Sequence, residues 1–392
     1  MKDIVLKKGK EESLGRRHPW VFSGAIASTP SDITEGEWVR VLAADGTQLG
    51  HGHYQIGSIT VRMLTFGDEE ASPSIYTARL RNAFNLRKAL GLIRPDNNCF
   101  RLVHGEGDFL PGLVVDIYGD TAVVQAHSPG MHKERNLIAD ALVNLPDARI
   151  RNVYYKSETT LPFMARLDPQ NGYIIGHFDG NLALENGLQF SIDWLKGQKT
   201  GFFLDQRDNR ALLERYAHGR DVLNMFCYTG GFSVYALRGG ANRVVSVDSS
   251  SKAIALTEAN VALNFPDETR HEAVATDAFK FLDGIGDGEY DLIVLDPPAF
   301  AKHKSALRNG LIGYRRLNAK AFERIRKGGI LFTFSCSQVV TKEAFRLAVF
   351  SAAVQSGRRV RILHQLTQPA DHPVDIAHPE GEYLKGLVLY VE

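Results

Sequence analysis

The second half of the chain, from Asp221 onward, alternates apolar runs with amphipathic segments, and no other feature constrains the fold as strongly. Short uninterrupted runs such as Leu292–Leu295 are typical of strands that are buried on both faces. The helical patterns between them supply the crossovers that parallel strands need. This half therefore predicts an open, mostly parallel α/β sheet with helices on both sides. The last strand, Gly386–Val391, follows no helix, so we expect it to insert antiparallel.

Three polar segments directly follow or end three of these strands. They are Asn224–Phe232, Leu295–Phe300 and Thr333–Ser337. Open α/β sheets bind their ligands at the carboxyl ends of the strands. A glycine turn, an acid with two prolines, and a cysteine at this one edge together predict methyl transfer to a pyrimidine carbon.

The first segment predicts a site for S-adenosylmethionine. Its loop, Tyr228–Phe232, has two glycines before a helix but lacks the third glycine of a dinucleotide fingerprint. Such a helix start suits the anionic end of a ligand, and Asp248 at the end of the next strand would accept from ribose hydroxyls. Asp277 follows a third apolar stretch and is a candidate for the adenine amino group, although an aspartate that caps the next helix is an equally good interpretation. The alternative for the loop is a doubly wound domain without a cofactor.

The second segment, Asp296–Pro298, predicts a clamp for a flat ring. Consecutive prolines after a buried strand fix the backbone and leave carbonyl groups unpaired. In amino-group methyltransferases such a segment receives a planar NH2 group. Here Asp296 could instead bond the N3 edge of a flipped cytosine and stabilise the charge that develops there. A purely structural turn is the alternative.

Cys336 decides between these two uses of the clamp. Carbon 5 of a pyrimidine is a poor nucleophile, so a thiolate must first add to carbon 6. Cys336 lies at a strand end between two serines, which suits an accessible thiolate better than Cys227, which lies in the glycine-loop segment. An inert core cysteine is the alternative.

Composition excludes several classes of protein. A hydrophobic content of 44% and a charged content of 23% are those of a soluble globular protein. No apolar run approaches the roughly 20 residues of a membrane helix, and the first residues lack a secretory signal, so we expect a cytoplasmic location and no membrane partner. Cys99, Cys227 and Cys336 have no metal-ligand spacing, so reduced thiols and no metal site are expected.

The chain's 392 residues predict two or three domains. Residues 1–73 contain short strands separated by glycine turns, which predicts a small β-barrel. The acidic segment Gly67–Ser74 is the best linker candidate. Residues 74–188 predict a central α+β domain that opens with a helix closed by Gly91 and contains a second helix over about 132–143. Residues 189–392 hold the α/β sheet.

The net charge of +1 argues neither for nor against a nucleic acid partner, since 46 basic and 45 acidic residues can be sorted onto different faces. Basic residues crowd the N-terminus beside an aromatic side chain that could stack on a base. We therefore expect the barrel to bind RNA, with an ordinary solvated edge as the alternative. The candidates are Lys7, Lys8, Lys10, Arg16, Arg17 and Trp20.

At these residues the chain resembles the ribosomal RNA large subunit methyltransferase I family over nearly its full length. The motifs are Arg16–Gly24, Leu110–Leu113, Lys199–Arg207, Tyr228–Phe232, Asp296–Pro298, Phe334–Ser337, Ala370–Val374 and Pro379–Gly386. The resemblance implies a PUA domain, a central domain that shapes an RNA cleft, and a Rossmann-like class I methyltransferase domain, with a possible homodimer. It also implies 23S rRNA or a large-subunit precursor as substrate, 5-methylcytidine as product, and Cys336 as nucleophile.

The site residues are assigned on this basis. The catalytic residues are Cys336 and Asp296. The residues expected to bind S-adenosylmethionine are Phe226, Tyr228, Gly230, Gly231, Asp248, Asp277, Asp296 and Gln206. The residues expected to bind RNA are those of the barrel together with Lys199 and Arg207.

The chain departs from the family at Ala299, where close relatives usually carry a lysine, and this leaves the exact target nucleotide open. Unlike the other large class of RNA cytosine-5 methyltransferases, the chain has no cysteine after Asp296–Pro298, so another group must take the carbon 5 proton. His372, His378 and Asp296 through a water are the candidates.

Two other hypotheses stay open. An exocyclic-amine RNA methyltransferase of the same fold is favoured by Asp296–Pro298 and disfavoured by Cys336. A non-catalytic rRNA-binding assembly factor would leave Asp248 and the glycine loop without a purpose.

Overall fold

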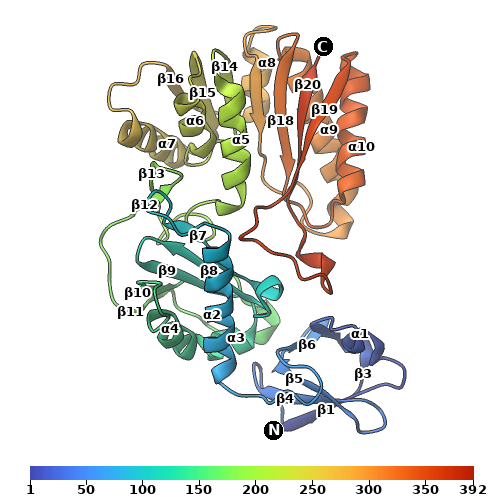
Figure 1. Ribbon diagram of the computed structural model, residues 1–392. Helices are drawn as coiled ribbons and strands as arrows, with labels where there is room; N and C mark the ends of the chain where they lie inside the picture. The colour runs from blue at the N-terminus through green and yellow to red at the C-terminus, as the bar shows by residue number, and fades with distance from the viewer. The chain divides into compact units, whose positions relative to one another are not determined.

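The computed structural model describes all 392 residues, and the contacts among them divide the chain into two compact units (Figure 1). Unit 1 comprises Met1–Gly187, Ile192–Leu204 and Ala370–Gly381, and unit 2 comprises Leu188–Ser191, Asp205–Pro369 and Glu382–Glu392. Each unit therefore gathers segments that are far apart in the sequence. No helix in the chain is both long and apolar enough to span a membrane. The cytoplasmic location stays a prediction.

Unit 1 begins with a six-stranded sheet in the order β2-β6-β5-β4-β1-β3. Its elements are β1 (Lys2–Leu6), α1 (Glu12–Gly15), β2 (Trp20–Phe22), β3 (Ile26–Ser28), β4 (Trp38–Leu42), β5 (Gln48–Tyr54) and β6 (Ile59–Met63). The glycine-rich pattern has a physical reason at Gly52, where a Cβ atom would lie 2.3 Å from the Arg62 carbonyl oxygen. Strands β5 and β6 thus approach so closely that only glycine fits.

The rest of unit 1 is built on a five-stranded sheet in the order β11-β10-β9-β8-β7. Its elements are α2 (Ser74–Ala89), β7 (Cys99–His104), β8 (Leu113–Tyr118), β9 (Thr121–Ala126), α3 (Pro129–Lys133), α4 (Arg135–Val143), β10 (Asn152–Tyr155), β11 (Gly172–Ile175) and β12 (Leu182–Glu185). The helix predicted to close at Gly91 is confirmed, since α2 ends just before this residue, whose φ is 66°. The single helix expected over about 132–143 is instead two helices that meet at Glu134.

Hydrophobic packing separates three cores. One cluster lies in the first sheet, around Ile4, Val39 and Val61. A second joins α2 and α4 to the five-stranded sheet, and the third fills unit 2. Apart from Leu64, the buried residues of each cluster lie within one of the three predicted domains. The boundaries at residues 73 and 188 stay a prediction.

Unit 2 is a seven-stranded sheet in the order β16-β15-β14-β17-β18-β20-β19, with helices on both faces (Figure 1). Its elements are β13 (Leu188–Ser191), α5 (Arg207–Ala217), β14 (Asp221–Met225), α6 (Gly231–Arg238), β15 (Arg243–Asp248), α7 (Ser251–Asn264), β16 (His271–Ala275), α8 (Ala278–Gly284), β17 (Leu292–Leu295), α9 (Leu307–Arg324), β18 (Gly329–Ser335), α10 (Lys342–Ser356), β19 (Val360–Leu366) and β20 (Lys385–Val391). The predicted α/β fold is confirmed.

The strand directions place the candidate residues at one edge of this sheet. Strands β14, β15, β16, β17 and β18 pair parallel with one another. Strand β20 pairs antiparallel with β18, as expected, and brings Lys385 opposite Ser335. All parallel strands end at the same edge, which is also where β20 begins.

Candidate active site

The glycine loop after β14 is held by α7. The Thr257 hydroxyl donates to the Tyr228 carbonyl oxygen at 2.9 Å, and the Asn260 amide donates to the Thr229 carbonyl oxygen at 2.8 Å. Gly230 has a φ of 78°, and a Cβ atom there would lie 2.6 Å from the Thr257 methyl group. The loop therefore needs glycine at this position for both its backbone conformation and its packing.

Two more loop residues, Phe226 and Tyr228, also have positive φ, at 59° and 48°. Left-handed backbone at non-glycine residues is costly and clusters at ligand sites. Gly231 opens α6, and a Cβ atom there would lie 3.0 Å from the Arg210 side chain. These features leave a narrow backbone cradle at the start of α6.

Asp248 is fixed beside this loop. Its Oδ2 atom accepts the Tyr228 N–H at 3.1 Å and its Oδ1 atom accepts the Ser250 N–H at 2.9 Å. Each carboxylate oxygen keeps a further lone pair for a ligand hydroxyl. Asp248 is thus oriented by two backbone N–H groups, one in the glycine loop and one just before α7.

Asp277 caps the N-terminus of α8, where its Oδ1 atom accepts the Lys280 N–H at 3.0 Å. This is the capping role that the sequence allowed equally. A contact with adenine stays a prediction.

Asp296 follows β17 and lies near a second acid, Asp205. The Gln206 amide donates to Asp296 Oδ2 at 3.1 Å, and the Tyr383 hydroxyl donates to Asp205 Oδ2 at 2.7 Å. Burial, followed by the negative charge of Asp205, raises the pKa of Asp296 to about 7. The Asp296 carboxyl is therefore protonated in a large fraction of molecules at neutral pH.

The residues present fit S-adenosylmethionine. Asp205 Oδ1 is buried and has no hydrogen-bond partner, so a ligand ammonium group would satisfy it and offset the repulsion between the two acids. Asp248 supplies acceptors for ribose hydroxyls, and the backbone N–H groups at the start of α6 suit the anionic end of the ligand.

Cys336 follows β18 directly and is the one cysteine of the chain that is not buried. Cys99 is completely buried, and Cys227 is 6% exposed. Burial raises the pKa of Cys227 to about 12, so its thiolate is not populated near neutral pH. The sequence indicated Cys336 as the accessible cysteine, and the burial of the other two agrees with this prediction.

The backbone after Cys336 is anchored by two side chains. Lys385 donates to the carbonyl oxygens of Ser337 and Val340, at 2.5 and 2.7 Å. The Tyr314 hydroxyl lies 3.0 Å from the Ser337 hydroxyl. Burial lowers the pKa of Lys385 to about 8, while the nearby Cys336 acts in the opposite direction. Lys385 therefore remains mostly charged at neutral pH and lies close enough to Cys336 to stabilise a thiolate.

Sequence reasoning gave Lys385, Asp205 and Tyr383 no role, although all three lie in the quoted motifs. Lys385 is the first residue of β20. It lies opposite Ser335 because β20 inserts antiparallel to β18. The proximity of Asp205 to Asp296 could not be predicted either, because Asp205 precedes α5 and is far from β17 in the sequence.

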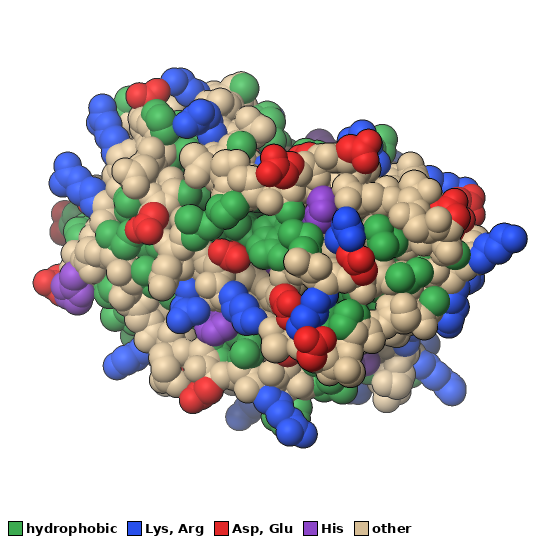
Figure 2. All heavy atoms as spheres, turned by 90° about the horizontal axis from the view of Figure 1, so that it is seen from below, with side chains coloured by type: hydrophobic (Ala, Val, Ile, Leu, Met, Phe, Trp, Pro, Cys, Tyr) green, Lys and Arg blue, Asp and Glu red, His purple; other side chains and the backbone are tan.

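The expected RNA-binding residues of the first sheet differ in exposure. The five basic residues are exposed, while Trp20 is half-buried. The Trp20 indole donates to Glu106 at 2.7 Å and its ring lies 4.2 Å from the His378 ring. Trp20 thus serves packing, and its stacking on RNA stays a prediction. On the face shown in Figure 2, Lys and Arg side chains are interspersed with Asp and Glu.

The two other expected RNA contacts also differ. Lys199 is exposed on a turn with a φ of 51°. Arg207, the first residue of α5, is 2% exposed. A guanidinium this deeply buried is poorly placed for phosphate contact, so we do not propose Arg207 as an RNA contact.

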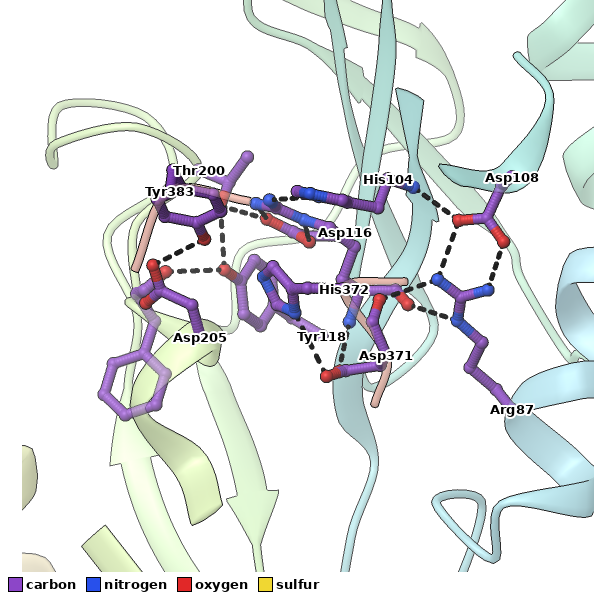
Figure 3. A network of polar contacts seen from close by, with 12 residues as sticks. Arg87, His104, Asp108, Asp116, Tyr118, Thr200, Asp205, Asp371, His372 and Tyr383 are labelled. Carbon is purple, nitrogen blue, oxygen red and sulfur yellow. Dashed lines mark hydrogen bonds and ion pairs between the residues drawn. The ribbon is translucent and has the colours of Figure 1, made fainter. Parts of the chain in front are cut away.

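His372 lies in a buried network of unit 1 (Figure 3). Its Nδ1 atom is 3.1 Å from Asp371, whose Oδ2 atom accepts the Arg101 N–H at 3.0 Å. Arg87 binds Asp108 through two nitrogens and donates to the Asp371 carbonyl oxygen at 2.7 Å. This network ties the segment 370–381 to the central sheet, so His372 has a structural role.

His378 is also buried, at 2% exposed, and its Nδ1 atom lies 3.0 Å from Glu380. His18 lies 3.5 Å from the same carboxylate, and one ligand atom from each of the three residues lies within 4.8 Å of the others. Such a group could hold a metal ion, so the expectation of no metal stays a prediction.

Comparison with known proteins agrees with this arrangement. Residues 160–381 match the family of S-adenosylmethionine-dependent methyltransferases, and residues 4–66 match the PUA-like domain. A putative S-adenosylmethionine-dependent methyltransferase from Streptococcus mutans has a TM-score of 0.83 at 22% identity, with both chains covered at 100%. A putative methyltransferase in complex with S-adenosylhomocysteine has a TM-score of 0.85 at 23% identity, also with both chains covered at 100%. These likenesses show the fold.

The chain is thus an S-adenosylmethionine-dependent methyltransferase with a PUA-like domain. Curated relatives define it further. The protein named ribosomal RNA large subunit methyltransferase I of Tolumonas auensis is 41% identical over 393 residues, which cover 98% of each chain. The protein of that name from Escherichia coli SMS-3-5 is 39% identical over 395 residues, which cover 99% of each chain. The chain belongs to the ribosomal RNA large subunit methyltransferase I family.

Proposed function

We propose that this protein methylates carbon 5 of a cytosine in 23S rRNA or a large-subunit precursor. The names of its relatives support a large-subunit rRNA substrate. The observation that carries the choice of carbon 5 is the position of Cys336, a partly exposed cysteine directly after β18, next to strand β17, which Asp296 follows. The product 5-methylcytidine follows from thiol addition, which an amine methyltransferase does not need.

The first step is addition of the Cys336 thiolate to carbon 6 of the cytosine. The S–C6 bond forms, and the electrons of the C5–C6 double bond move toward N3, which takes a proton from Asp296. Carbon 5 then has the enamine character that a methyl acceptor requires. S-adenosylmethionine, when bound, supplies the methyl group.

The last step removes the carbon 5 proton and expels the Cys336 sulfur as thiolate, which restores the C5–C6 double bond, and the proton on N3 is then released to solvent. Asp296 has by then given up its proton, so its carboxylate is available as the acceptor, through a water. His372 and His378 are both engaged in buried contacts of unit 1. We therefore favour Asp296 among the three candidates.

We predict that Lys385→Met moves the pH at which Cys336 becomes reactive upward, because an ammonium close to the thiol is removed. Iodoacetamide labelling of Cys336 against pH measures this midpoint. Lys385→Arg retains the charge and should keep the midpoint near that of the wild type. An unshifted midpoint in Lys385→Met, with the fold intact by thermal unfolding, would mean that Lys385 only anchors the backbone.

We predict that Asp248→Ala weakens S-adenosylmethionine binding by about 1.5–3 kcal/mol, because a charge-assisted hydrogen bond to the ribose is removed. Calorimetry of the two proteins measures this difference. Lys252→Ala, which removes a charge in the first turn of α7 without removing an acceptor for ribose, is the matched control. Unaltered affinity in Asp248→Ala would reject the assignment.

The barrel residues Lys7, Lys8, Lys10, Arg16 and Arg17, together with Lys199, are proposed to supply RNA affinity. The possible homodimer also stays a proposal. Helix α10 exposes Leu347, Phe350 and Val354 by 61–65%, and an apolar face of this kind is typical of a surface that a second copy covers.

Mass mapping of modified nucleosides tests the proposed function. rRNA from cells that lack the protein should lose one 5-methylcytidine, and the purified protein should restore it. The second candidate is an exocyclic-amine methyltransferase, which Asp296–Pro298 favours. Appearance of a methylamino base in place of 5-methylcytidine would establish that candidate.

A further inference from the structure

A cavity of about 500 Å³ lies in unit 1, and none of the residues used in the mechanism above lines it. It is lined by residues that follow β9 and β10 and by the turn that precedes Thr200. Its volume is in the range of sites that bind small ligands or single groups of a larger one. Lys199, which the sequence indicated as an RNA contact, is one of the residues that line it.

The charge of this cavity favours an anion. Lys156, Lys196 and Lys199 line it, against one carboxylate, Glu158. Lys156 donates to the Gly197 carbonyl oxygen at 2.7 Å, which ties the turn to β10. The Glu158 carboxylate already accepts a hydrogen bond from the Asn171 N–H at 3.2 Å. Phosphate is the anion of RNA that such lysines bind.

The polar groups of the cavity favour a base beside that phosphate. His127 Nε2 is buried and has no hydrogen-bond partner. Burial, with the positive charges of Lys199 and Arg62 nearby, lowers the pKa of His127 to about 4, so the neutral ring has one donor and one acceptor nitrogen. Asn171 Oδ1 accepts the Ser157 and Glu158 N–H groups, which leaves its NH2 group to donate to a ligand.

We infer that this cavity binds one unpaired ribonucleotide of the RNA substrate, with its phosphate at Lys156 and Lys199 and its base edge at His127 and Asn171. Only an unpaired nucleotide presents its base edge to a concave site. Leu195, which is 51% exposed at the cavity, supplies an apolar surface for the base. The inference rests on the proposed function, because it names where the RNA is held in addition to the target cytosine.

Fluorescence anisotropy of a labelled, unpaired RNA with the full chain tests the inference. Lys199→Gln should bind about 3- to 10-fold more weakly, and the slope of log Kd against log salt should fall by about 0.7, the value for one fewer neutralised phosphate on a single strand. His127→Phe, which keeps a ring of similar shape, should bind about 5-fold more weakly with an unchanged slope, since it no longer bonds a base. The matched control is Lys88→Gln, whose lysine is exposed and lies 3.5 Å from Asp147.

Binding of both variants equal to that of Lys88→Gln would overturn the inference. If His127→Phe fails to fold, the salt slope of Lys199→Gln decides. Competition distinguishes the source of the ligand: millimolar cytidine monophosphate or inorganic phosphate should leave the RNA bound. Displacement by micromolar cytidine monophosphate would instead identify a site for free nucleotides and overturn the RNA assignment.

These measurements need no methyl transfer, so they separate the two proposals. Loss of RNA binding in the cavity variants supports the cavity even if the reaction product is not 5-methylcytidine. Wild-type formation of 5-methylcytidine with unaffected RNA binding in both cavity variants rejects the cavity alone.

Discussion

Cys336→Ala should lose nearly all methyl transfer while it binds S-adenosylmethionine as tightly as the wild type. Without the thiol adduct, carbon 5 of cytosine has no enamine character, so the barrier to methylation is not lowered. Loss of a nucleophile of this kind costs several orders of magnitude in rate. Single-turnover methylation of rRNA measures the rate, and calorimetry measures cofactor affinity.

Cys227→Ala is the matched control, because Cys227 is a buried thiol of the same unit and its pKa is raised to about 12. It should keep the activity, apart from a modest packing loss. RNA with 5-fluorocytidine at the target should form a stable adduct with the wild type at Cys336, since fluorine does not leave as a proton does. Methylation by Cys336→Ala, or an adduct mapped to Cys227 or Cys99, would contradict the mechanism.

The second large effect is expected at Asp296, whose pKa is raised to about 7 by burial and by Asp205. Its protonated form is present below that pKa and is lost as the pH rises through it, so proton donation to N3 should weaken as the pH rises, and at a lower pH once the ligand ammonium offsets the charge of Asp205. The rate of methyl transfer should therefore show a declining alkaline limb. Asp296→Asn should remove this limb and slow the reaction by about 10²–10⁴-fold, because an amide cannot donate a proton to N3.

Asp205→Asn is the informative companion variant. It removes the negative charge that raises the pKa of Asp296, so the alkaline limb should move to lower pH. Single-turnover rates across pH, at saturating S-adenosylmethionine and RNA, measure both variants. An unchanged limb in Asp296→Asn would assign the titration to another group.

The agreement between prediction and structure is closest where short-range pattern decides. The buried run Leu292–Leu295 became β17, and Gly91 followed the end of α2, because apolar periodicity and backbone freedom are local properties. Disagreement arose where two interpretations share one local pattern. The expected helix over 132–143 breaks at Glu134, and the cap at Asp277 satisfies the same residues that a ligand contact would.

The sequence by itself determined the α/β order of unit 2 and the edge at which Asp248, Asp296 and Cys336 meet, because parallel strands all end on one side of a sheet. Tertiary structure alone decided the electrostatics of that edge. The raised pKa of Asp296 depends on its burial and on Asp205, and the ammonium beside Cys336 depends on the register of β20, which pairs Lys385 with Ser335. Burial and the proximity of charges depend on residues that are distant in the chain, so no local pattern predicts them.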